Sequence, residues 1–164
     1  MIVREAALDD ATAIADVLAL AFEEYRPDYT AAAYEATTPS ASDVRLRLRE
    51  GPIWLAIDGV RAVGTVSAKR TLEGIYLRGM AILPDARGLG IGVALLDCVV
   101  EYARRESASR LYLSTTPFLL RAIRLYERYG FRRIEGGPPD LHGTPLFTME
   151  KVLASGSSAP PARP

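Results

Sequence analysis

Three glycines alternate with other residues where a short apolar run gives way to an amphipathic helix pattern. They are Gly88, Gly90 and Gly92, in the sequence LPDARGLGIGVALLDCVVEYA of residues 83–103. The first amides of a helix lack intrahelical partners and carry partial positive charge, and glycine lets a ligand approach the backbone closely. The pattern therefore predicts either a backbone cradle for an anion such as pyrophosphate or a plain flexible turn.

Two common nucleotide-binding motifs fit this loop poorly. A Walker loop ends in Gly-Lys followed by Ser or Thr, but Gly92 is followed by Val93 and Ala94. A dinucleotide-binding fingerprint has G-x-G-x-x-G spacing after the first strand, whereas these alternating glycines follow later strands. Neither motif explains the loop.

The hydrophobic pattern elsewhere predicts a mixed sheet flanked by helices. Asp9 or Asp10 can cap a first helix, Asp58-Gly59 is typical of a hairpin turn, and Gly130 ends the last helix. Hairpins precede the glycine-rich loop, and strands do not alternate strictly with helices, which favours a mixed α/β sheet over a doubly wound one. We expect strands at 2–5, 53–57, 60–69, 75–83, 111–114, 131–135 and 146–152, helices after Asp10 and over 44–50, 95–105 and 118–129, and a loop or short broken helix over 26–42.

Length and composition exclude several classes of protein. The 164 residues suit one domain, and 20 Lys plus Arg balance 20 Asp plus Glu, so no basic excess indicates a nucleic-acid partner. The single cysteine, Cys98, lies in an apolar run, which is typical of a core residue in a reducing compartment. No apolar run reaches membrane-spanning length and the N-terminus lacks a signal-peptide core, so we expect a cytoplasmic protein with no membrane partner.

The residues around the loop resemble those of the GNAT superfamily of N-acetyltransferases. The acyl-CoA signature of that family, Arg/Gln-x-x-Gly-x-Gly/Ala, stands here as RGLGIG at 87–92, preceded by the strand end MAILP at 80–84. The downstream segment LYERYGF at 125–131 matches the end of the family's next helix. The resemblance covers residues 2–152, so we expect an acetyltransferase domain over 1–153 and a disordered tail over 154–164.

The resemblance implies an acyl-CoA N-acyltransferase fold, whose mostly antiparallel sheet parts between its fourth and fifth strands to admit the pantetheine arm of acetyl-CoA. In that family the strand before the loop holds the pantetheine through its backbone, and the loop amides bind the pyrophosphate. Tyr126 matches the catalytic tyrosine that protonates the departing thiolate, and no metal is implied. The cofactor-binding positions carried over are Met80, Ala81, Ile82, Arg87, Gly88, Leu89, Gly90, Ile91, Gly92 and Val93.

Several of these assignments have structural alternatives. Tyr126 could be a core tyrosine on an apolar helix face, and Arg87 a solvated loop arginine. The family often has an asparagine seven residues before the tyrosine, but that position is Leu119 here, so this polar contact to the cofactor is unassigned. The general base is open as well: Glu73 and His142 are candidates, and each is also typical of an exposed turn residue.

The resemblance identifies the acetyl donor but not the acceptor. Tyr25, Tyr29 and Tyr34 could line an acceptor pocket or serve packing, and specificity is expected in residues 26–42 and 136–145. We expect an N-acetyltransferase that moves acetyl from acetyl-CoA to a primary amine by direct attack in a ternary complex. The alternatives are a non-catalytic acyl-CoA-binding or regulatory module and an acyltransferase that uses a longer acyl-CoA. The expected partners are acetyl-CoA and the amine, with a homodimer left open.

Overall fold

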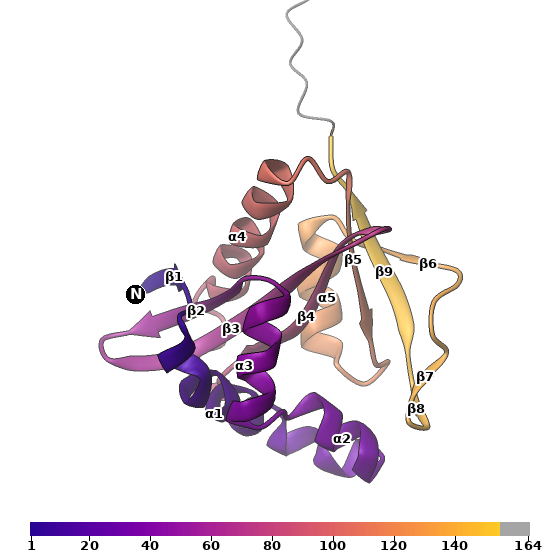
Figure 1. Ribbon diagram of the computed structural model, residues 1–164. Helices are drawn as coiled ribbons and strands as arrows, with labels where there is room; N and C mark the ends of the chain where they lie inside the picture. The colour runs from indigo at the N-terminus through magenta and orange to yellow at the C-terminus, as the bar shows by residue number, and fades with distance from the viewer. Residues whose placement is uncertain (155–164) are drawn as a thin grey trace, which may run out of the picture.

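The computed structural model describes residues 1–154, which fold around a seven-stranded sheet (Figure 1). The strands are β1 (Ile2–Glu5), β2 (Ile53–Asp58), β3 (Arg61–Thr71), β4 (Gly74–Ile82), β5 (Arg110–Thr115), β6 (Arg132–Ile134) and β9 (Phe147–Val152). Their order across the sheet is β1-β2-β3-β4-β5-β9-β6, with β4 and β5 parallel and the other neighbours antiparallel. The expected mixed, mostly antiparallel sheet is confirmed.

Helices cover both faces of the sheet (Figure 1). One face carries α1 (Ala11–Phe22) and α3 (Ala41–Glu50), with α2 (Ala31–Thr37) beside them, and the other carries α4 (Ile91–Arg105) and α5 (Leu120–Tyr129). Short 3-10 turns at Leu8–Asp10, Glu23–Asp28 and Pro84–Ala86 lead into or out of these elements. The helices thus form two layers with the sheet between them.

The two strands at the centre of the sheet separate soon after they meet. Only Ile75 with Leu111 and Tyr76 with Tyr112 pair between β4 and β5, and the remainder of β4 makes no ladder with β5. On its other edge, β4 pairs with β3 as far as Ile82. The predicted parting between the fourth and fifth strands is therefore confirmed, and it leaves one edge of β4 without a strand partner.

Close packing fixes α4 against the sheet. Leu95 is fully buried, and a Cβ added at Gly64 of β3 would lie 3.3 Å from its Cδ1 atom and 3.0 Å from Cγ2 of Ile91. Glycine at position 64 therefore lets the first turns of α4 approach the strand. On the opposite face, Leu18 of α1 is also fully buried against the sheet.

Several element boundaries differ from those predicted. Ser40 and Asp43 form a capping box, in which each side chain accepts a hydrogen bond from the other residue's amide, so α3 starts at Ala41 instead of 44. The helix after the glycine-rich loop starts at Ile91 instead of 95. The hairpin turn consists of Gly59 and Val60, one residue later than Asp58-Gly59.

The segment predicted as a loop or short broken helix contains the helix α2. The Thr30 hydroxyl caps it by accepting a hydrogen bond from the Ala33 amide at 3.2 Å. The Thr30 amide in turn donates to Oγ1 of Thr144 at 2.9 Å. Thr144 belongs to a small hairpin that the sequence did not indicate, made of β7 (Asp140–Leu141) and β8 (Thr144–Pro145). The two segments expected to carry specificity are therefore in direct contact.

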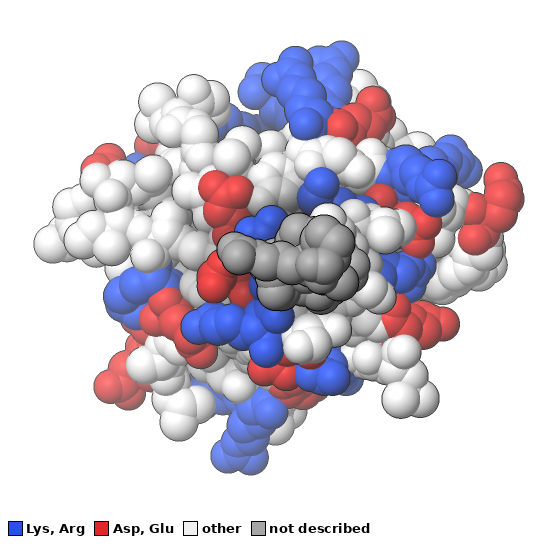
Figure 2. All heavy atoms as spheres, turned by 90° about the horizontal axis from the view of Figure 1, so that it is seen from above, with Lys and Arg blue, Asp and Glu red and all other residues white. Residues whose placement is uncertain are grey.

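Charged side chains of both signs alternate over the face seen in Figure 2, with no extended field of one sign. Within residues 1–154, every helix is too short or too polar to cross a bilayer. Of the predicted tail, Ala154 is exposed, and the rest lies outside the described residues.

Candidate functional site

A cavity of about 580 Å³ lies where α1 ends, β4 parts from β5 and α5 begins. This volume is typical of small-molecule sites. Its walls combine the unpaired part of β4, the glycine-rich loop and one side of α5, which come together only in the folded chain. The lining residues are Ala21, Phe22, Tyr25, Met80, Ala81, Ile82, Ala86, Arg87, Gly88, Gly90, Ile91, Gly92, Val93, Leu119, Arg121, Ala122, Arg124, Leu125, Tyr126 and Arg128.

The glycine-rich loop presents backbone to this cavity. Gly88 and Gly90 have φ angles of +80° and +79°, which lie in the left-handed region that favours glycine. Nothing lies within 4 Å of a Cβ built at either position. Gly90 is the N-cap of α4 and has no side chain, so no side chain caps the first amides of α4. Such an arrangement suits an anion.

Two other residues of the RGLGIG segment, Gly92 and Leu89, have different surroundings from the two left-handed glycines. Gly92 is buried inside α4, where a Cβ would lie 2.5 Å from Cδ2 of Leu125 and 3.3 Å from Cδ1 of Ile82. Gly92 therefore lets α4 approach α5. Leu89 is 67% exposed and does not line the cavity. Every other predicted cofactor-binding residue lines it.

Arg87 lies at the cavity wall with its guanidinium group already engaged. It forms an ion pair with Glu24 and donates to the carbonyl oxygens of Ile82 at 3.3 Å and Ala21 at 3.4 Å. Its side chain is only 19% exposed. These contacts link the end of α1 to the end of β4, so the arginine has a structural role in this arrangement besides the phosphate role that its motif position predicts.

Three further arginines, which the sequence motifs do not identify, line the cavity from α5. Arg121, Arg124 and Arg128 are spaced by three and four residues, which places them on one helix face. The spacing was visible in the sequence, but only the packing of α5 beside the loop shows that this face borders the cavity. Together with the loop amides they give the cavity a positive electrostatic character.

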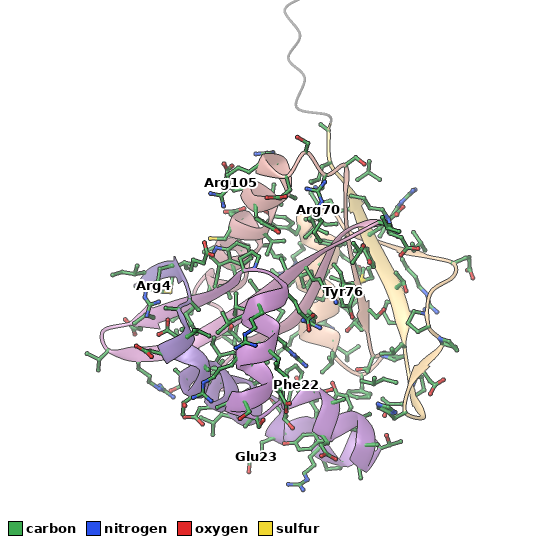
Figure 3. The ribbon with its side chains drawn as sticks, viewed as in Figure 1. Arg4, Phe22, Glu23, Arg70, Tyr76 and Arg105 are labelled. Carbon is green, nitrogen blue, oxygen red and sulfur yellow. The ribbon has the colours of Figure 1, made fainter. Side chains whose placement is uncertain are left out.

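Tyr126 is the buried polar group of the cavity. It is 5% exposed, and its ring packs against Phe131 with centroids 5.6 Å apart. Burial raises the pKa of its phenol, and the neighbouring Tyr29 and Tyr76 phenols raise it further. The phenol therefore stays protonated throughout the neutral range. Tyr76 is the last residue of β4 that pairs with β5, so it lies where the two strands part (Figure 3).

Neither candidate base is among the lining residues of the cavity. Glu73 is exposed in the turn before β4, and at roughly 3.3 Å per residue the strand separates it from Met80 by about 20 Å. His142 is exposed in the turn between β7 and β8, where its backbone φ is +46°. Cys98 is half-buried on α4, and burial raises the pKa of its thiol, which favours the packing role.

The three N-terminal tyrosines join an aromatic cluster next to the cavity. Tyr29 packs edge-on against Phe118 with ring centroids 4.9 Å apart, and Tyr25 and Tyr34 flank these rings. Burial raises the pKa of Tyr29 to about 12. Phe22, at the end of α1, touches the same cluster and also lines the cavity (Figure 3). The segment 26–42 therefore borders the site through its aromatic side chains.

Known proteins share both the sequence pattern and the fold. The probable N-acetyltransferase camello of Xenopus tropicalis is 34% identical over 102 residues, which are 58% of this chain and 46% of that protein. The N-acetylaspartate synthetase of Danio rerio is 36% identical over 83 residues, 49% of this chain and 29% of that protein. The chain thus spans less than half the length of these curated relatives.

A solved structure supports the fold over nearly the whole chain. The PaiA N-acetyltransferase of Thermoplasma acidophilum, in complex with coenzyme A, superposes with a TM-score of 0.79, covering 92% of this chain and 98% of that one at 16% identity. The model of the acetyltransferase (GNAT) family matches residues 14–131, which include β4, the glycine-rich loop and α5. The chain therefore belongs to the GNAT acetyltransferase family.

Proposed function

We propose that this chain transfers the acetyl group of acetyl-CoA to a primary amine by direct attack in a ternary complex. The observation that carries the proposal is the cavity that joins an uncapped helix N-terminus, an unpaired strand edge and a buried phenol. An uncapped helix N-terminus suits pyrophosphate, and an unpaired strand edge suits the amide groups of a pantetheine arm. Few other ligands would use all three features at once.

The residues of the cavity fit the parts of acetyl-CoA. The backbone of Met80, Ala81 and Ile82 would pair with the pantetheine, and the amides of residues 88–93 would bind the pyrophosphate. Arg121, Arg124 and Arg128 would offset phosphate charge at the same wall.

The chemistry then needs one attack and one protonation. The amine nitrogen attacks the thioester carbonyl carbon, the tetrahedral intermediate collapses, and the carbon–sulfur bond breaks to leave CoA thiolate. The Tyr126 phenol donates its proton to that thiolate, and the proton released by the amine restores the phenol through solvent. A buried, protonated phenol suits this role because a bare thiolate is costly in a poorly hydrated cleft.

The test is the Tyr126→Phe variant, assayed by thiol release from acetyl-CoA over a panel of amines. Loss of a general acid should lower kcat by at least about 100-fold, while the Kd of CoA stays within about twofold. Tyr129→Phe is the matched control, because the Tyr129 hydroxyl instead donates to Asp97 at 2.6 Å.

Each alternative result has a distinct meaning. Unchanged turnover in Tyr126→Phe would remove this residue from the mechanism. Tight CoA binding by the wild type with no turnover on any amine would favour the non-catalytic module instead.

A further inference from the structure

Two arginines from different elements approach each other on the side of the sheet that α1 and α3 cover. Arg47 comes from α3 and Arg78 from β4. The Nη1 atom of Arg47 lies 3.4 Å from the position that a Cβ on Gly79 would occupy. Each arginine side chain is partly withdrawn from solvent, and the proximity of Arg78 contributes to lowering the pKa of Arg47, after burial itself. Like charges held together in this way are unfavourable unless an anion compensates them.

The protein itself compensates this charge incompletely. Glu50 is shared, because it pairs with Arg78 at 2.6 Å and with Lys69 at 3.1 Å. Arg47 has no ion pair within residues 1–154, and its one hydrogen bond goes to the neutral carbonyl of Ala36 at 3.2 Å. One carboxylate thus pairs with two cations, and Arg47 has only longer-range attraction from Glu50 and Asp43.

Arg78 also keeps an unused donor. Its Nε atom is buried without a hydrogen-bond partner among the described residues. A buried donor without a partner is costly, and its presence in a native fold indicates a group that is satisfied by something else. A guanidinium group offers a planar fork that matches the two oxygens of a carboxylate.

The arginine pair lies close to the reaction centre of the proposed transferase. Gly79, with φ of +58°, forms a bulge where the β3–β4 register shifts, and it separates Arg78 from Met80 of the cavity wall. Tyr76, two residues before Arg78, is one of the phenols that raise the pKa of Tyr126. The pair is thus on the same stretch of β4 as the proposed thioester site.

We propose that Arg47 and Arg78 bind a carboxylate of the amine acceptor. The acceptor class is then an amino acid or a related amine that carries a carboxylate a few bonds from its reacting nitrogen. This substrate class rests on the proposed acetyltransferase function. The covalent step is unchanged: the amine nitrogen forms the new bond to the acetyl carbon, CoA thiol leaves, and the carboxylate only positions the amine.

The first test compares acceptors that differ in the carboxylate alone. Thiol release is measured with alanine, alaninamide and ethylamine, and with phenylalanine, phenylalaninamide and phenethylamine, with rates referred to the concentration of free amine. The proposal predicts that kcat/KM for each acid exceeds that for its amide by about 10- to 100-fold, the range for a hydrogen-bonded charge pair. Equal values for acid and amide would overturn it.

The second test removes the charge. Arg47→Gln keeps a donor for the Ala36 carbonyl but loses the cation, so the ratio of kcat/KM for acid over amide should fall by about 10- to 100-fold. Arg45→Gln is the matched control, because Arg45 lies exposed on the same helix and its loss should leave the ratio unchanged. Thermal unfolding of each variant verifies that it is folded, and Arg47→Lys, which keeps the charge, should retain part of the preference. An unchanged ratio in a folded Arg47→Gln variant would overturn the proposal.

A binding measurement separates the two proposals. N-acetylalanine and N-acetylalaninamide are titrated by calorimetry into the protein saturated with CoA. If the wild type binds the acid more tightly than the amide and Arg47→Gln does not, the carboxylate site stands even where no amine is acetylated, and only the transferase function fails. If amides and simple amines are acetylated as well as acids, the transferase function stands and the carboxylate site is refuted.

Discussion

Replacing Gly90 by alanine tests whether the loop backbone holds the cofactor phosphates. The residue is held at φ of +79° with open space around its missing side chain, so alanine meets no steric clash and only the backbone strain counts. An alanine in the left-handed region costs about 1–2 kcal/mol. A 150-residue domain should therefore lose about 2–8 °C in Tm.

The same strain should weaken CoA binding if the amides at the start of α4 hold the pyrophosphate. The loop can relieve the strain only by moving those amides, and CoA must then restore them. The same 1–2 kcal/mol divides between folding and binding, so the Kd of CoA should rise by up to about 5- to 30-fold, and the loss in Tm should be smaller as the rise in Kd is larger. Calorimetric titration with CoA measures this value, and a thermal melt on the same sample measures the stability.

Gly59→Ala is the matched control. Gly59 has φ of +61° and equally open surroundings, but it lies in the β2–β3 hairpin turn and does not line the cavity. Its replacement should lower Tm by a similar amount and leave the Kd of CoA unchanged. Wild-type affinity together with wild-type Tm in Gly90→Ala would refute the amide cradle, and equal weakening of CoA binding in both variants would attribute the effect to stability alone.

Two further predictions concern stability. Leu95→Ala removes a fully buried side chain that packs closely on Gly64 of β3. The free energy of unfolding, measured with urea, should fall by about 2–5 kcal/mol. A fall below about 1 kcal/mol would contradict the close packing of α4 on β3. Burial raises the folded-state pKa of Tyr126 above the value of about 10 in an unfolded chain. Above pH 10 the phenol therefore ionises more readily in the unfolded chain, and the free energy of unfolding falls as the pH rises. Below pH 10 this loss is absent. Urea unfolding between pH 9 and 11 should show a decline that is shallower in Tyr126→Phe by up to about 1.4 kcal/mol per pH unit, and identical slopes would show that the phenol ionises equally in both states.

Local patterns were enough to predict the strands of the seven-stranded sheet, α1 and the site loop. The central strands β2, β3 and β4 contain apolar runs bounded by turn residues, and the loop and LYERYGF segments carry motifs that can be recognised from residue spacing alone. The observed helix boundaries differ from the predicted ones where a single side chain or backbone angle determines the start of a helix. Ser40 caps α3, so this helix starts earlier than predicted. Gly90, in the left-handed conformation, is the N-cap of α4, so α4 also starts earlier than predicted.

Features that depend on distant residues could not be predicted in this way. The helix α2 is short and lies between two prolines, and its N-cap is held by a hairpin more than a hundred residues later. Arg47 and Arg78 meet only because the Arg47 side chain of α3 reaches across to Gly79 of β4. The three glycines look alike in the sequence, yet Gly92 serves helix packing while Gly88 and Gly90 shape the loop, a division that depends on the position of Leu125.

The hydrogen bonds of Thr30 bear on how chains of this kind can exchange parts. Its amide and hydroxyl bind Oγ1 of Thr144 and the carbonyl of His142, so residues 26–42 and 136–145 share one anchoring point. A chimera that takes the first segment from a relative and keeps the second would lose these cross-contacts unless the relative also carries Thr at position 30. The two segments should therefore be exchanged together when a chimera is made to change acceptor preference. For the same reason we expect the two segments to vary together between relatives.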